Sequence, residues 1–139
     1  MNHGLSESTI SQIVSVLGRF PQVEKAVLFG SRASGRARPD SDVDVGIEPA
    51  DPLLPPSAEL DLAARLSSAS GAEVDLVRLD QDAPLLGRKI ARVGVCLLEA
   101  TPGLFAAWRA DALSRWIEWE ETMAPYRARF LPRLAGART

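Results

Sequence analysis

The stretch "LFGSRASGRARPDSDVDVGIE", residues 28–48, joins a turn of small residues to a run of alternating carboxylates. Asp42 and Asp44 stand two residues apart and alternate with Val43 and Val45. This period of two is typical of a strand with one polar face and one apolar face. Both carboxylates are therefore expected on the same face, with Cα atoms about 6.6 Å apart. Burial of the valine face would leave the two carboxylates open to solvent.

The carboxylate pair is a candidate metal site, because oxygens of both side chains could share a cation of the size of Mg²⁺ at about 2.1 Å. Asp75, in "EVDLVRL", adds a third carboxylate between the apolar neighbours Val74 and Leu76. A charge among apolar residues is costly unless something compensates it. If the strand of Asp75 lies beside the strand of Asp42, one or two Mg²⁺ ions would compensate all three. The alternative, which the pair alone does not exclude, is the solvated face of an edge strand.

The turn before the carboxylates has the ingredients of a polyphosphate site. Gly30 follows a β-rich run and permits close approach of the backbone, while Ser31 offers a hydroxyl and an N–H group. Arg32 is a candidate phosphate clamp, with a solvated surface residue as the alternative. Charged residues in loops are usually solvated, which makes the remaining cations weaker candidates. These are Arg36, Arg38 and Lys89.

Two other motifs are nearly matched and are excluded. The string "GSRASGRA" has the glycine spacing of a P-loop, but Arg36 and Ala37 replace the lysine and the hydroxyl residue. The string "DSDVDVGIEPAD" imitates a calcium loop, but Gly46 falls at its seventh position instead of its sixth, and Asp51 replaces the closing glutamate. Neither motif has both the spacing and the chemistry that its ligand requires.

The rest of the chain predicts an alternation of helices and strands. Strands are predicted at 23–30, 41–48, 72–79 and 95–100, and helices at 6–20, 58–70, 85–93 and from Thr101 onward. Ser57 is the predicted cap of the helix at 58–70. The apolar residues of that helix are Leu60, Ala63, Ala64 and Leu66. This order indicates an α/β or α+β fold, with a small mixed sheet flanked by helices.

Composition supports one globular domain over residues 1–139, since 46% of the residues are apolar and 24% are charged. No run of eighteen apolar residues and no signal-peptide pattern is present, so we expect a cytoplasmic protein without a membrane span. The net charge of −2 disfavours nucleic acid as a direct substrate. The single cysteine, Cys96, stands in an apolar run and is expected to be a buried, inert thiol.

The last predicted helix carries large apolar residues at steps of three and four. They are Leu104, Phe105, Trp108, Ala112, Trp116, Trp119 and Met123. We interpret them as a packing stripe rather than a platform for bases, and any exposed part would be covered by a partner protein. Residues 126–139 contain four arginines and no acid, and Pro125 and Pro132 limit the helicity there. A loosely ordered basic tail is expected, with docking on an acidic partner or nucleic acid as the alternative.

The motif "GS", ten residues, then "DVD", from Gly30 to Asp44, resembles a known signature. It is the G-S-x(10)-D-x-D pattern of the minimal nucleotidyltransferases (MNT) of the DNA polymerase β superfamily, and Asp75 stands where that family places its third catalytic carboxylate. The order of predicted elements over residues 20–125 extends the resemblance. The chain is most similar to the MntA-type antitoxins of HEPN/MNT toxin–antitoxin pairs. The resemblance implies a polymerase β-like nucleotidyltransferase domain.

The same resemblance implies roles for individual residues. Gly30 and Ser31 would hold the triphosphate of ATP, and Asp42 and Asp44 would bind Mg²⁺. Asp75 would complete the metal site and help to activate the acceptor hydroxyl as a general base.

The implied activity is Mg²⁺-dependent transfer of AMP from ATP to a tyrosine hydroxyl of a cognate HEPN-domain RNase toxin, which silences it. One alternative acceptor is a small molecule, as in the aminoglycoside-modifying relatives, although 139 residues leave little chain for such a pocket. The other alternative is a non-catalytic antitoxin that acts by contact alone. A pure binding module has no need of three mutually repelling carboxylates, which argues against it.

Overall fold

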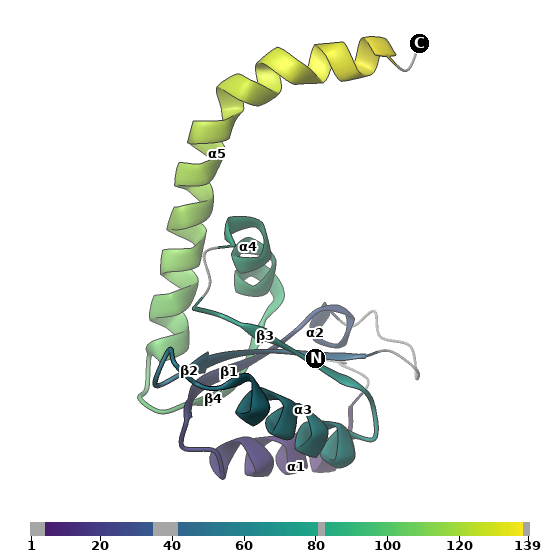
Figure 1. Cartoon of the computed structure of the whole chain (residues 1–139), viewed down its shortest axis with the longest axis vertical. Helices are drawn as coiled ribbons and strands as arrows, with labels where there is room; N and C mark the ends of the chain where they lie inside the picture. The colour runs from purple at the N-terminus through teal and green to yellow at the C-terminus, as the bar shows by residue number, and fades with distance from the viewer. Residues whose placement is uncertain (1–4, 35–41, 81–82, 138–139) are drawn as a thin grey trace.

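The computed structural model of the chain describes residues 5–34, 42–80 and 83–137 (Figure 1). Its centre is a four-stranded sheet in the order β3-β2-β1-β4. The strands are β1 (Val23–Phe29), β2 (Val43–Pro49), β3 (Val74–Arg78) and β4 (Val95–Glu99). β1 runs antiparallel to both β2 and β4, whereas β2 and β3 are parallel. The predicted small mixed sheet is therefore confirmed.

One face of the sheet is covered by α1 (Glu7–Gly18) and α3 (Pro56–Ser70), which lie together below it in Figure 1. The alternation in β2 explains this packing, because its apolar residues at 43, 45 and 47 are fully buried against these helices. The core on this face includes Val43, Val45 and Ile47 of β2, Ile13 and Leu17 of α1, and Leu62 and Leu66 of α3. Asp44, between two of the buried valines, therefore belongs to the opposite face.

The opposite face is covered in part by α4 (Pro84–Val93) and by the start of α5 (Leu104–Ala137). Val27, Leu79 and Ile90 form a second core there. The indole N–H of Trp108 donates a hydrogen bond to the carbonyl oxygen of Leu79 at 3.3 Å. Lys25 is only 2% exposed, and its ammonium group lies 5.4 Å from the centre of the Trp108 ring. These contacts fix the first turns of α5 to the sheet.

The start and the buried face of α3 differ from the sequence prediction. The helix begins at Pro56, so Ser57 lies in its first turn and is not the cap. Proline is favoured at the first helical position because its fixed φ suits the helix and its missing N–H is not needed there. The buried residues of α3 are Leu62 and Leu66, while Leu60 is 72% exposed. The predicted apolar face was therefore wrong for Leu60 and for Ala64, which is also exposed, because the helix is rotated toward Leu62.

The longest helix, α5, includes both Pro125 and Pro132 and ends at Ala137. The expectation that these prolines limit the helicity of this region was wrong. Figure 1 shows that α5 bends on its way from the sheet to the C-terminus. Proline removes a helical N–H donor and collides with the preceding turn, which is a common cause of such bends.

Cys96 is half-buried on β4, and burial raises the pKa of its thiol above the usual value. The thiol is therefore protonated at neutral pH, in line with the expected inert role. Across the three described segments, no helix combines the length and the apolar character needed to cross a membrane.

Candidate active site

The parallel pairing of β2 with β3 places Asp44 directly opposite Asp75. The strand of Asp75 thus lies beside the strand of the first carboxylate pair, which is the condition for a shared metal site. Asp42 immediately precedes β2 and is exposed, as is Asp75, whereas Asp44 is half-buried. The register is fixed at this end by the N–H of Val43, which donates to the carbonyl oxygen of Glu73 at 2.9 Å. Three carboxylates from two separate stretches of the sequence thus meet at one end of two neighbouring strands.

The three carboxylates influence one another electrostatically. The pKa of Asp44 is raised, first because burial disfavours its charged form, and then because the negative charges of Asp75 and Asp42 repel it. Repulsion of this kind is relieved when a cation binds among the carboxylates. The site is therefore arranged to favour a bound positive charge near Asp44.

Gly30 links the preceding turn to this carboxylate. It follows β1 with φ at +75°, a conformation that residues with a Cβ atom rarely adopt. A Cβ atom at this position would lie 2.2 Å from Oδ2 of Asp44. The neighbouring Phe29 pairs with Asp44 across the sheet, which explains the close approach. Glycine is therefore required at this position for two reasons, the positive φ of the backbone and the close approach of the Asp44 carboxylate.

The residues after Gly30 form a short helix, α2 (Ser31–Ser34), where a loop was expected. Its Arg32 is 4% exposed, so Arg32 is not a solvated surface residue. Its role as a phosphate clamp stays a prediction. Lys89 is exposed on α4. Arg36 and Arg38 lie outside the described residues.

The donor set suits a hard divalent cation, since it consists of carboxylate oxygens alone. Among the described residues, no three His, Cys, Asp or Glu side chains are already gathered closely enough to hold a metal ion. Binding of Mg²⁺ by Asp42, Asp44 and Asp75 therefore requires their side chains to converge on it. The assignment of these three ligands stays a prediction.

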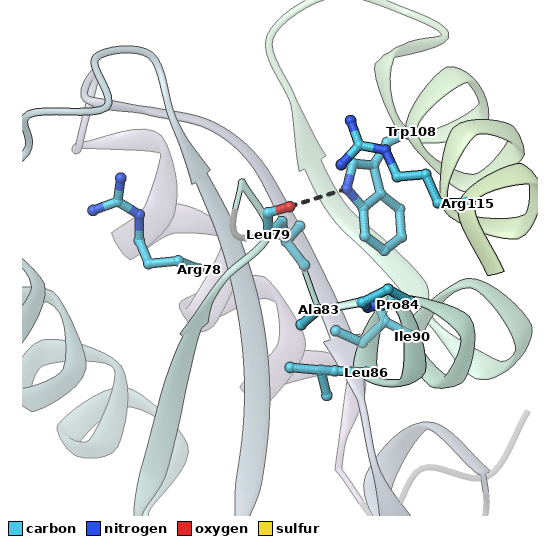
Figure 2. Close-up of a pocket in the computed structure, with 9 residues that line it drawn as sticks. Arg78, Leu79, Ala83, Pro84, Leu86, Ile90, Trp108 and Arg115 are labelled. Atoms are coloured by element: carbon cyan, nitrogen blue, oxygen red, sulfur yellow. Dashed lines mark hydrogen bonds between the residues drawn. The ribbon is translucent and has the colours of Figure 1, made fainter. Parts of the chain in front are cut away.

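One pocket lies away from the carboxylates, where the end of β3 meets α4 and α5 (Figure 2). Figure 2 shows Leu79, Leu86 and Ile90 beside it, with the hydrogen bond from Trp108 to Leu79 across it. Its volume of about 30 Å³ has room for only a few water molecules. A nucleotide does not fit there, so this pocket is a packing space rather than the substrate site.

We did not predict from the sequence that Leu79 covers part of the polar face of β2. A Cβ atom on Gly46 would lie 2.6 Å from Cδ2 of Leu79, so the leucine side chain lies directly over this glycine. Gly46 shares a face of β2 with Asp44. Leu79 thus covers the polar face of β2 one step beyond the carboxylate. The signal was the glycine itself, because glycine within a strand often marks a close approach by another group.

Comparison with known proteins places the carboxylates within a known family. The family model for polymerase beta, nucleotidyltransferase, matches residues 11–102, which include all three carboxylates. The protein adenylyltransferase MntA of Shewanella oneidensis is 31% identical over 90 residues, which cover 65% of this chain and 63% of MntA. The matched region thus spans less than two thirds of that relative.

Two solved structures share the fold. A toxin–antitoxin crystal structure with AMP-PNP contains a chain that is 24% identical, with a TM-score of 0.75 over 88% of this chain and 98% of that one. A complex of tri-AMPylated Shewanella oneidensis HEPN toxin with MNT antitoxin contains a chain that is 22% identical, with a TM-score of 0.69 over 88% of this chain and 96% of that one.

Proposed function

Because the chain belongs to the polymerase beta nucleotidyltransferase family, we propose that it transfers AMP from ATP to a tyrosine hydroxyl of a HEPN-domain toxin. It would thereby act as the antitoxin of that toxin. The observation that carries the proposal is the pairing of Asp44 with Asp75 at the strand ends, next to the Gly30 turn. The adenylyltransferase relative and the fold shared with antitoxins in toxin complexes support the choice of AMP and of a protein acceptor.

Each site residue has a role in this reaction. Gly30 and Ser31 hold the triphosphate, with Arg32 as a further phosphate contact. Asp42, Asp44 and Asp75 hold Mg²⁺, which neutralises negative charge on the phosphates when bound.

The transfer itself exchanges one bond to the α-phosphorus of ATP for another. The tyrosine oxygen forms a bond to this phosphorus as the bond to the β-phosphate oxygen breaks, and pyrophosphate leaves. Asp75 is the exposed carboxylate of the strand pair and accepts the phenolic proton.

Labelling with ATP tests this function. The purified protein, ATP labelled at the α-phosphate, Mg²⁺ and the product of the adjacent open reading frame should yield a covalently labelled product, with the label on tyrosine. Asp42→Asn should abolish the labelling. The matched control is Asp61→Asn, because Asp61 lies in an exposed ion pair with Arg65 on α3, which covers the face of the sheet opposite to Asp44.

No labelling by the intact protein would refute the proposed transfer. Neutralisation of the toxin by the Asp42→Asn variant, without labelling, would instead indicate an antitoxin that acts by contact. Labelling that does not require the partner would indicate another acceptor.

A further inference from the structure

The apolar stripe of α5 continues beyond the part of the helix that the domain covers. Near the sheet, Phe105 and Trp108 pack against the second core, and Ala112 is buried. Farther along, Trp119 is 36% exposed and Tyr126 is 53% exposed. The same face of the helix therefore changes from a packed surface to an open one.

Helical spacing shows that these residues belong to one face. Trp116, Trp119, Met123 and Tyr126 follow one another at steps of three and four, which keeps them in a single row along the helix. Ile117 is also 57% exposed, but its position in the helical repeat is outside this row. Trp116 is half-buried beneath Arg88 of α4 and Met123 is half-buried, so the row opens toward Tyr126. The open row is thus an ordered surface, distinct from single exposed apolar residues elsewhere.

The open row lies on the same side of the sheet as the carboxylates. Figure 1 shows that α1 and α3 lie on one side, while α4 and the distal turns of α5 lie on the other. Asp44 belongs to the face opposite α1 and α3, because its strand neighbours are buried against those helices. A protein seated on distal α5 would therefore be on the side from which an acceptor must approach.

A groove extends the open row toward the domain. It lies between the start of α4 and α5 and has a volume of about 350 Å³. Its lining is Ala83, Pro84, Leu85, Leu86, Lys89 and Trp119. Leu85 is more than half exposed, and Trp119 belongs to both the groove and the row. The groove and the row form one continuous apolar surface.

The charges beside this surface indicate what it binds. Three glutamates, Glu118, Glu120 and Glu121, stand beside Trp119, and after Glu121 the sequence contains four arginines and no acidic residue. Arg127 pairs with Glu120 of the same helix, and Arg129 is exposed. The complementary surface has an apolar centre, basic groups opposite the glutamates beside Trp119 and acidic groups opposite the arginines beyond them. A second copy aligned in parallel would bring the arginines of both chains together, which disfavours that pairing.

We propose that residues 116–137 of α5 form a docking arm for the acceptor protein, which presents an apolar surface to Trp119, Met123 and Tyr126 and acidic groups to the arginines that follow them. This inference rests on the proposed function, because the acceptor there is a protein. It also accounts for a helix that extends past its own domain, since helices in proteins are stabilised mainly by packing of an apolar face. Acceptor binding supplies that packing.

The test compares two charge insertions on the same helix. Tyr126→Glu places a charge in the open row, and Ile117→Glu places one outside the row at a similarly exposed apolar residue. Binding to the product of the adjacent open reading frame is measured by isothermal titration calorimetry, and binding of ATP with Mg²⁺ is measured in parallel. Tyr126→Glu should raise the Kd for the protein partner at least about 30-fold, as for a central interface residue, while Ile117→Glu changes it by less than about 2-fold.

Binding of ATP should be the same in both variants and the wild-type protein, since both residues lie on α5 beyond the turns that pack against the sheet. Tyr126→Ala, a milder change, should weaken partner binding in the same direction if the glutamate variant fails to fold. Partner binding that is unchanged in the tyrosine variants, or weakened equally by Ile117→Glu, would overturn the docking arm. A shift of Tyr126→Glu from dimer to monomer in sedimentation, without any change in its affinity for the partner, would also overturn the docking arm. In that case a second copy of this chain would occupy the row.

These outcomes separate the docking arm from the proposed reaction. If Tyr126→Glu still transfers AMP and binds the partner with undiminished affinity, the proposed reaction stands and the docking arm is refuted. Loss of binding in Tyr126→Glu, when the original protein binds the partner but does not label it, supports the arm and refutes the reaction.

Discussion

Replacing Asp44 with asparagine is expected to abolish AMP transfer while raising the melting temperature of the protein. Transfer should fall at least about 100-fold, because metal stabilisation of charge in the transition state contributes several kcal/mol and each ~1.36 kcal/mol corresponds to a factor of ten. The melting temperature should rise because the variant removes one of three repelling carboxylates. Transfer of α-labelled AMP and thermal unfolding without Mg²⁺ measure the two effects.

The stability gain should depend on pH in a defined direction. The folded-state pKa of Asp44 is raised above its ordinary value of 3.8, so the folded protein holds this proton more tightly than the unfolded chain. The stability of the wild-type protein therefore falls as the pH rises from the ordinary pKa of an aspartate through the folded-state pKa of Asp44. The variant should be more stable at neutral pH, and the difference should vanish below the ordinary value. A variant that melts at a lower temperature than the original at neutral pH would contradict this account of the site.

Replacing Gly30 with alanine is expected to remove most activity by displacing a carboxylate that is fourteen positions away in the sequence. The new Cβ atom would collide with Oδ2 of Asp44, at 2.2 Å, and the positive φ would cost about 1 to 2 kcal/mol in addition. Transfer should fall by at least about 100-fold, as for a misplaced catalytic group. Initial rates of AMP transfer and the free energy of unfolding in urea measure the two consequences.

Gly71→Ala is the matched control for Gly30→Ala. Gly71, at the end of α3, has φ at +71°, close to the value at Gly30, but a Cβ atom there would meet no other group within 4 Å. The control should lose a similar amount of stability from backbone strain and keep its transfer rate. Equal losses of activity in both variants would show that strain alone, and not contact with Asp44, makes Gly30 necessary.

The end of the sheet that carries the carboxylates could be predicted because its sequence signals are local. Alternation around Asp42 and Asp44 identified the polar face of β2, and the apolar neighbours of Asp75 identified a second strand. The contacts between elements could not be predicted in the same way. The close approach of Leu79 to Gly46 depends on how the end of β3 turns over the sheet, and the rotation of α3 toward Leu62 depends on its packing with α1.

The distal part of α5 shows a second limit of prediction from the sequence. Its apolar spacing identified a packing stripe, but spacing alone does not say where the covering surface ends. The structure shows cover for Trp108 and open surface at Tyr126. The prolines within the stripe predicted an interruption of the helix, whereas the structure accommodates them in a bent one.

The parallel pairing of β2 with β3 has a consequence for synthesis of the chain. Parallel neighbours cannot be joined by a tight hairpin, so the chain must complete α3 before Asp75 comes to lie opposite Asp44. A ribosome-bound fragment that ends before β3 has the Gly30 turn and two of the carboxylates but not the third. Such a nascent chain should gain its affinity for Mg²⁺ with ATP only after β3 has emerged, so that co-translational folding would set the moment at which the proposed site is complete.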